Sequence, residues 1–427
     1  MPEGEGSGVP AAADGDQFIP VRKVDIVAAL VEHSSLADDD HDKFRQLCRL
    51  LGAIYHYEYF DRLERLRADY FYFNPEIEPH ARFDDDARKR AYSDLLDTLT
   101  SALKSANFIE VPHAEIDRAH RARAVLRVEL KVPLDDYREV RFFRRGHHRE
   151  TFPIVEWFGL RKRTIEAMVH DDVLLLVAIK PEAQIASKRE RSRLAHGKVR
   201  PGSVLIKYFH NIAATDLIAL YPNVRVVMST FDKLALGLPA LVGSVPIALS
   251  LTSTLTVLFL VIGFYLGVVG VVKDDDVKKA LAAMSGLAAL GGFIVRQWMN
   301  YQRRSLKYQK VLTDNIYFHN TNNNAGIFDA VIGAAEDQEC KEAFLAYYFL
   351  HIAVERPTQA MLERRIETWL KQTFEVEVEF AVDEALAKLD RLGVLIRTGD
   401  RLAVPALDEA LERLDCVWSN FFCNPGA

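Results

Sequence analysis

The sequence predicts an α+β membrane protein with a helical and antiparallel-sheet domain, a transmembrane helical hairpin and a C-terminal helical, winged-helix-like region. Three observations predict this class. No charged side chain occurs from Leu234 to Val272, helical and strand periodicities precede this run, and helices followed by a short ribbon come after it. The expected boundaries are a disordered 1–17, an α+β domain over 18–233, the hairpin over 234–299 and the helical region over 300–427.

Length and composition limit the number of domains and the class of protein. The chain has 427 residues and a net charge of -6, which suggests two to three domains and gives no global case for a nucleic-acid binder. The first 17 residues are acidic and rich in Gly, Ala and Pro, so we expect neither a secretory signal nor a transit peptide. The four cysteines show no CxxC spacing, which favours reduced thiols, and we expect no cofactor.

The first domain reads as helices followed by strands. One amphipathic helix is marked by Phe44, Leu47, Leu51 and Ile54. Another is marked by Leu95, Leu96, Leu99 and Leu103 after the acidic start at residues 84–86. Strands are expected from Val128 to Val132, near Val140 and Phe142, and over 164–170, 173–180 and 204–209. Together they predict a largely antiparallel sheet.

The hairpin is expected to place two spans at about 247–272 and 279–298. A spanning helix needs about 20 apolar residues, which the first segment supplies and the second only approaches. The small residues expected at the contact between the two helices are Gly263, Gly267, Ser285 and Gly292. The alternative is a single span followed by an amphipathic or buried helix, which would separate the two soluble regions.

The basic residues that flank the spans favour a cytoplasmic position for both soluble regions. Arg296, Arg303 and Arg304 follow the second span, whereas the connecting loop offers Lys273 and a lysine pair at 278–279. We therefore expect an inner-membrane protein with both termini in the cytoplasm.

The C-terminal region is expected to hold helices over 334–350, 358–370 and 383–392, the last ending at Gly393. Two short strands, 394–397 and 401–404, follow. The third helix carries more acidic than basic residues, which disfavours phosphate contacts with DNA. A protein-contact or structural role is favoured, and no nucleic-acid partner is expected.

Two basic stretches are candidates for an anionic ligand or a lipid headgroup. They contain Arg141, Arg144, Arg145 and Arg149, and then Lys188, Arg189, Arg191 and Arg193. A solvated loop is the alternative for the second stretch. The pair His147–His148 is not expected to bind a metal, because its neighbours are cationic.

Glu339 and Glu342 share one helix face and could act as paired carboxylates, although exposed helix charges explain such spacing more simply. No P-loop, GxSxG, HExxH or dinucleotide motif occurs.

Three stretches resemble the transmembrane protein 143-like family, which is defined by a domain of unknown function. They are residues 18–23, 211–243 and 322–350. The resemblance implies a topology and no catalytic residue. The polar positions that match the family are Asp216, Asn322, Gln338, Glu339 and Glu342. Eukaryotic members are associated with mitochondria, whereas this N-terminus favours a bacterial inner membrane.

The function expected from the sequence is a non-enzymatic, membrane-anchored adaptor or sensor. The alternative is an enzyme or binder that acts at a membrane surface on an anionic ligand, and a pore subunit is less favoured because neither span carries a charge. The expected partners are the lipid bilayer, anionic headgroups and a protein bound through the C-terminal region. Oligomerisation stays open.

Overall fold

The computed structural model describes most of the chain outside 228–318. The described residues are 17–32, 36–77, 84–112, 114–116, 129–156, 161–185, 187, 188, 191, 192, 194, 199–227, scattered positions between 259 and 306, and 319–423. The chain divides into two units: residues 1–116, 134–214 and 319–427 form the first, and residues 117–133 and 215–318 form the second.

The first unit begins with three helices, α1 (Lys23–Glu32), α2 (Asp38–Tyr70) and α3 (Asp85–Ser105). The predicted apolar stripe of α2 is confirmed, because Phe44, Leu47, Leu51 and Ile54 are all fully buried. The acidic start predicted for α3 is also confirmed: the carboxylate of Asp84 accepts a hydrogen bond from the amide of Ala87 and caps the helix.

A five-stranded antiparallel sheet follows, with the order β1-β3-β4-β5-β7. Its strands are β1 (Ile109–Glu110), β3 (Tyr137–Glu156), β4 (Arg161–Ile179), β5 (Val204–Ala213) and β7 (Asn320–Asn323). The chain also forms short 3₁₀ helices: η1 (Leu134–Asp136) and η3 (Glu182–Gln184) in the first unit, and η4 (Ala214–Leu220), which lies almost entirely in the second. The two strands predicted over 164–170 and 173–180 form one continuous strand, β4.

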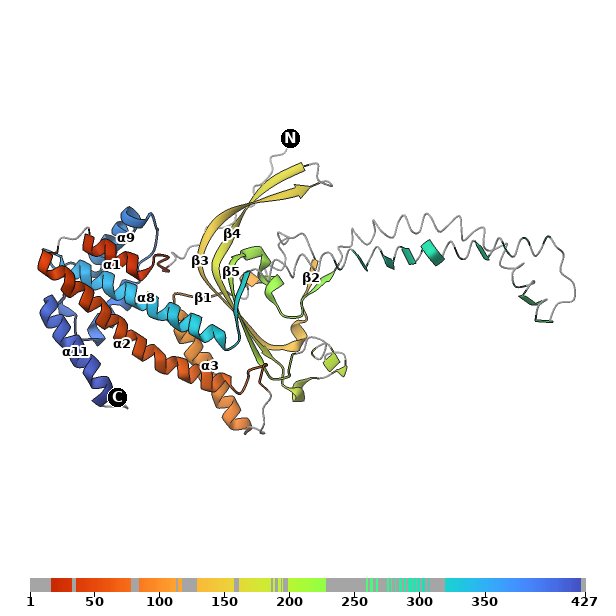
Figure 1. Ribbon diagram of the computed structural model, residues 1–427, viewed down its shortest axis with the longest axis horizontal. Helices are drawn as coiled ribbons and strands as arrows, with labels where there is room; N and C mark the ends of the chain where they lie inside the picture. Colours follow the sequence, from red (N-terminus) through yellow and green to blue (C-terminus); the bar gives the residue numbers. More distant parts are fainter. Residues whose placement is uncertain are drawn as a thin grey trace. The chain divides into compact units, whose positions relative to one another are not determined.

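The long hairpin of β3 and β4 curves along its length (Figure 1). Gly146 lies in this hairpin with φ +65°, and a Cβ at this position would approach the Asp171 carboxylate oxygen to 2.2 Å. Only glycine fits here, because a side chain would be strained and would also collide. Asn211 of β5, next to β4 in the sheet, has φ +53°.

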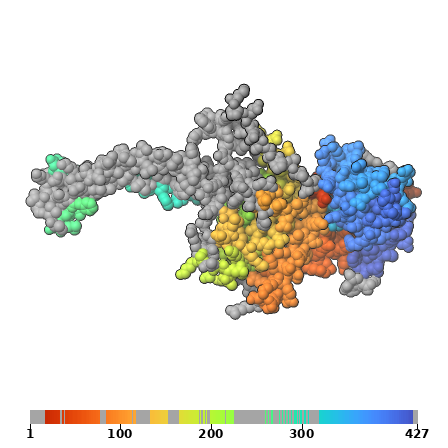
Figure 2. Space-filling view, turned by 180° about the vertical axis from the view of Figure 1, so that it is seen from behind, coloured from red at the N-terminus to blue at the C-terminus, as the bar shows by residue number. Residues whose placement is uncertain are grey.

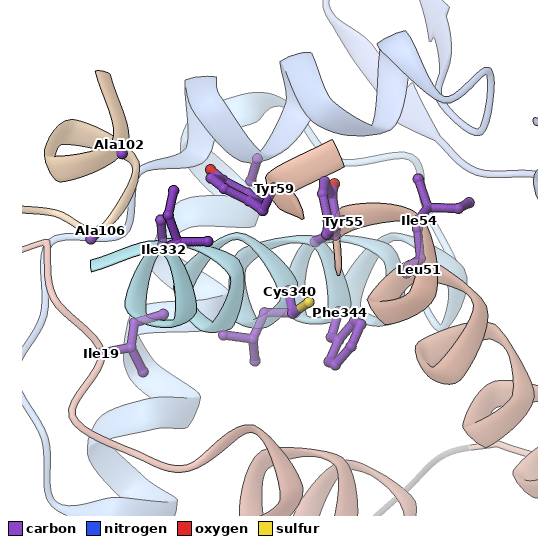
Figure 3. Close-up of a cluster of buried hydrophobic side chains, with 14 of the residues drawn as sticks. Ile19, Leu51, Ile54, Tyr55, Tyr59, Ala102, Ala106, Ile332, Cys340 and Phe344 are labelled. Atoms are coloured by element: carbon purple, nitrogen blue, oxygen red, sulfur yellow. The ribbon is translucent and has the colours of Figure 1, made fainter. Parts of the chain in front are cut away.

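The C-terminal region contributes α8 (Gly326–His351), α9 (Gln359–Phe374), α10 (Val382–Arg391), the ribbon β8 (Ile396–Thr398) and β9 (Arg401–Ala403), and α11 (Leu407–Cys423). The predicted order of helices and ribbon is present, with Gly393 at φ +71° just after α10. Helix α8 packs against α1, α2, α3, α9 and α10. Figure 3 shows Tyr55 and Tyr59 of α2 beside Ile332, Cys340 and Phe344 of α8.

The second unit holds a two-stranded antiparallel sheet. Its strands are β2 (Glu129–Lys131) and β6 (Arg225–Val227), and Leu130 pairs with Val226. The strand expected from Val128 to Val132 thus exists, but it belongs to this small sheet and not to the five-stranded one.

The predicted transmembrane hairpin is contradicted. No helix in the described part of the chain is long and apolar enough to cross a membrane. The long helices α2 and α8 carry many charged residues. Within the first predicted span, Leu266 and Gly267 form a turn and Gly267 has φ +76°, which ends the helix that includes Ile262. Most of 247–272 and 279–298 lies outside the described residues.

Two further predictions depended on this hairpin and are wrong with it: the class of multi-pass membrane protein, and the inner-membrane localisation with cytoplasmic termini. The predicted contact between the two spans required their helix backbones to approach each other closely at glycine residues. A Cβ added at Gly267 or Gly292 would meet no described atom within 4 Å. Gly263 and Ser285 are helical positions in the same segment.

Candidate functional site

The four arginines predicted as one anionic site on β3 do not act together. Arg141 donates from Nε to Glu139 at 2.6 Å and lies 3.9 Å from Glu110. Arg145 is buried and paired, and Arg149 is exposed near the far end of the strand. Strand alternation separates only Arg144 from the other three, and these three differ in burial and in partners.

Arg145 belongs to an internal ion-pair network. Its Nε donates to Asp172 at 2.9 Å, and its guanidinium carbon lies 4.3 Å from the ring centre of Phe18 and 4.7 Å from that of Phe108. His210 also bonds to Asp172. Burial would raise the pKa of Asp172, but hydrogen bonds and charges from His210 and Arg145 lower it. The cation is thus satisfied inside the protein and cannot serve an external anion.

Arg144 lies beside a buried histidine. The side chain of His170 is buried, and neither ring nitrogen has a hydrogen-bond partner among the described residues. Burial, and then the charges of Arg144 and His147, lower the pKa of His170 to about 4. This group is therefore neutral at physiological pH. No described pocket opens onto it.

The second basic stretch is only partly described. Lys188 and Arg191 are exposed, and Arg191 lies 3.7 Å from Glu182. Arg189 and Arg193 lie outside the described residues. These cations contribute no enclosed site in the described part of the chain.

The polar residues matched to the family are distributed over several elements. Gln338, Glu339 and Glu342 are buried on α8, so the explanation by exposed helix charges is wrong. Lys388 of α10 lies 3.1 Å from Glu339 and also bonds to Glu342. Asn107 donates to Glu342 at 3.1 Å. Asn322 pairs with Tyr208 at the edge of the sheet, and Asp216 lies in η4 of the second unit.

Burial raises the pKa of Glu342, and Lys388 offsets part of this shift. Burial would lower the pKa of Lys388, but Glu342 and Glu339 raise it. The paired carboxylates thus share a lysine counter-ion and have no route to a substrate in the described structure. Among the described residues, no three His, Cys, Asp or Glu side chains gather as metal ligands.

A pocket lined by several cations lies elsewhere, between α3 and the sheet. We call it the anion pocket; its volume is about 450 Å³. It is lined by Phe73, Asp85, Arg88, Lys89, Tyr92, Arg138, Ala178, Ile179, Pro181, Ala183, Gln184, Gly202, Ser203 and Val204. Figure 2 shows the orange surface of α3 adjoining the yellow to yellow-green surface of the sheet and the segment after β4.

Two guanidinium groups of this pocket are held by aromatic rings. The Cζ atom of Arg88 lies 5.4 Å from the ring centre of Phe73, and that of Arg138 lies 4.4 Å from the ring centre of Tyr92. The two rings meet edge to face with centroids 5.6 Å apart. These cation–π contacts help to position both guanidinium groups, each of which has further N–H groups that can donate hydrogen bonds.

The backbone beside Arg88 is shaped for this packing. Arg88 Nη2 donates to the carbonyl of Gly202 at 2.6 Å, and Gly202 has φ +72°. A Cβ at Gly202 would lie 2.7 Å from Arg88 Nη2. Glycine is thus favoured by the backbone conformation, and a Cβ would also displace the end of the Arg88 side chain.

The charge in the anion pocket is positive. Its lining includes three cationic side chains, Arg88, Lys89 and Arg138, and one carboxylate, Asp85. Neither arginine has a hydrogen bond or ion pair to a carboxylate among the described residues, whereas Lys89 contacts Asp86 at 3.0 Å. Burial, and then the charge of Arg200, lower the pKa of Arg88. Arg88 is half-buried and lies near another cation, which favours binding of an anion, whereas Lys89 and Arg138 are exposed.

The sequence motifs did not indicate this pocket. Arg88 and Tyr92 are one helical turn apart, which is a weak local signal, but Arg138 and Ser203 come from distant strands and loops. Only the tertiary fold brings them together.

Comparison with known proteins agrees with the absence of a recognised motif. Residues 170–326 match a family model described as a protein of unknown function (DUF3754). No solved structure matches the chain. The chain therefore contains a domain of unknown function over 170–326, which includes β5, β7 and most of β4.

Proposed function

We propose that this protein is a non-enzymatic sensor that binds a small phosphate- or carboxylate-bearing molecule in the anion pocket. The observation that supports this function is that Arg88 and Arg138 line one pocket, each over an aromatic ring. Neither has a hydrogen bond or ion pair to a carboxylate among the described residues, although the charges of Asp85 and Glu139 act on them. Guanidinium groups bind phosphate and carboxylate through two parallel hydrogen bonds.

The chemistry of the lining favours binding over catalysis. Ser203 is fully buried and its hydroxyl donates to the carbonyl of Arg200 at 2.6 Å. The hydroxyl of Tyr92 donates to Glu139 at 2.7 Å, and burial raises its pKa further above neutrality. Both hydroxyls are thus already used inside the protein, and no described group in the lining forms a nucleophile and base pair.

The apolar part of the lining indicates the shape of the ligand. Ala178, Ile179, Pro181 and Val204 line the pocket together with the cations. A ligand that combines an anionic group with a small apolar body would satisfy both surfaces. Phenyl phosphate has these two parts, whereas inorganic phosphate has only the first.

Isothermal titration calorimetry on the full chain tests this function. Phenyl phosphate is expected to bind more tightly than inorganic phosphate, and Arg138→Gln is expected to weaken binding at least about tenfold, because it removes a charge-assisted contact. Arg365→Gln, an exposed arginine of α9, is the matched control. No binding to the unmodified chain, or equal affinities for the two variants, would overturn the proposal.

The finer family relationship belongs to this proposal. We propose that the chain is a relative of the transmembrane protein 143-like family, since the stretch 211–243 lies inside the matched residues 170–326. The relationship supplies no catalytic residue and is compatible with a binding role.

A further inference from the structure

A second cavity lies between three helices and is separate from the anion pocket. We call it the α1–α2–α8 groove; its volume is about 510 Å³. It is lined by Lys23, Val24, Val27, Ala28 and Glu32 of α1, by Arg45, Cys48, Arg49 and Gly52 of α2, and by Glu336, Cys340 and Phe344 of α8. No residue is common to the two linings. The volume is that of a small-molecule site.

Each helix contributes one continuous stripe to the groove. The lining residues of α2 and α8 recur at spacings of three or four positions, which places them on one face of each helix. Figure 3 shows Cys340 and Phe344 one turn apart along α8. Because Gly52 has no side chain, and a Cβ built there would meet no described atom within 4 Å, the groove stays open at this point.

The interior of the groove is apolar. Cys48, Cys340 and Phe344 are buried, and Val24 is 70% exposed although it is aliphatic. Burial raises the pKa of Cys48, and burial also raises the pKa of Cys340 to about 12. Both thiols are therefore protonated and behave as small apolar groups.

The rim carries charges of both signs. Lys23 lies 3.6 Å from Glu336, and Arg45 lies 3.0 Å from Asp42, so these cations have partners. Arg49 is exposed and has no ion pair among the described residues, and the same holds for Glu32. The lining as a whole holds three cationic and two anionic side chains.

From this apolar interior and the small excess of cations over carboxylates in the lining, we infer that the α1–α2–α8 groove binds a single-chain aliphatic carboxylate. The chain lies along Val24, Val27 and Ala28 of α1, apolar lining residues that are not buried, and the carboxylate pairs with Arg49. An aliphatic chain gains free energy from burial in the groove, and a charged headgroup at the rim keeps its hydration while it contacts a guanidinium.

Binding of dodecanoate to the full chain, below its micelle concentration, tests the inference by calorimetry. Gly52→Phe fills the groove and is expected to abolish binding, whereas Gly52→Ala is the matched small substitution and should bind nearly as well. Equal dodecanoate affinity in a folded Gly52→Phe variant would overturn the inference, as would the absence of binding to the unmodified chain.

Two exposed rim variants keep the test decisive if Gly52→Phe does not fold. Arg49→Gln is expected to weaken dodecanoate binding about tenfold or more, and Glu32→Gln to strengthen it, because one removes an attraction and the other a repulsion. Dodecanol, without the charge, should respond to neither. Three results would each reject a carboxylate ligand. The two variants could change dodecanoate affinity in the opposite directions, or the groove could prefer dodecyltrimethylammonium. A dimer that forms with rising protein concentration and closes the groove would be the third.

Discussion

His170 shows how one buried side chain sets a pH dependence. It is 1% exposed, and both ring nitrogens lack partners in the described structure. Because its folded pKa is about 4 and an unfolded histidine titrates near 6.5, the unfolded state binds more protons between these values. This residue therefore costs the folded state on the order of 3 kcal/mol as the pH falls through that window.

His170→Phe is expected to remove this loss, since phenylalanine has a similar shape and does not titrate. Urea unfolding at pH 7, 6, 5 and 4 would measure the free energy of unfolding for both proteins. Leu174→Ala, at a buried residue of the same strand that does not titrate, is the control: it should lower the free energy of unfolding and leave its slope with pH unchanged. A variant at position 170 with the unmodified slope would contradict the assignment.

At this scale the sequence shows which residues are present but not which partners they meet. Glu339 and Glu342 were identified from their spacing, but exposure was the simpler explanation for two charges on a helix. Their lysine partner, Lys388, lies 46 residues beyond Glu342. Arg145 likewise looks like part of a basic surface in the sequence. In the structure it lies opposite Asp172 in the β3–β4 pair. Such pairings depend on the tertiary fold.

At the scale of elements, alanine substitutions at two glycines are expected to change the free energy of unfolding in opposite directions. Gly52 lies inside α2 with open space beside it, so Gly52→Ala is expected to raise the free energy of unfolding by about 0.5–1 kcal/mol through lower entropy of the unfolded chain. Gly202 has φ +72° and a close contact to Arg88, so Gly202→Ala is expected to lower it by more than about 1 kcal/mol.

Chemical denaturation followed by circular dichroism would measure both changes, and each variant serves as the control for the other. If both substitutions shifted stability in the same direction, the backbone assignment of one glycine would be wrong. Gly202→Ala should also weaken phenyl phosphate binding, because it displaces the guanidinium of Arg88.

The same backbone reasoning explains which elements were predictable. The stripes of α2 and α3, the acidic start of α3 and Gly393 are local signals, and the structure confirms them. The charge-free run predicts one continuous helix over 247–272, and the turn at Leu266 and Gly267 interrupts it. The lengths of strands are harder to predict. The sequence predicts a break at Asp171 and Asp172, between strands over 164–170 and 173–180, but pairing with β3 and β5 keeps β4 continuous there.

At the scale of the whole molecule, helices far apart in the sequence share the core of the first unit. Helix α8 packs against α2 and α3 from the N-terminal part and α10 from the C-terminal part. Lys104 lies 3.2 Å from Glu384, and Arg391 pairs with Glu58. Periodicity reports the buried face of each helix, but not which distant helix covers it. For the same reason, neither cavity could be predicted from the sequence.

From this shared core we predict how replacing its buried lysine, Lys388, changes the stability of the protein. Lys388→Met would leave Glu339 and Glu342 buried without a cation, which is expected to cost about 3–5 kcal/mol of stability at neutral pH. The loss should shrink as the pH falls, because burial already raises the pKa of Glu342 and protonation removes its charge. Adding Glu342→Gln should recover part of the loss for the same reason.

Hydrogen exchange would show where the cost of Lys388→Met appears. Because α8 connects both ends of the chain in one core, amides of α2 and α3 are expected to lose protection together with those of α8 and α10. The exposed Lys371→Met, in α9, is the control and should change neither set. Loss of protection confined to residues 359–423, with α2 and α3 unchanged, would mean that the C-terminal region unfolds independently and that the core is not cooperative.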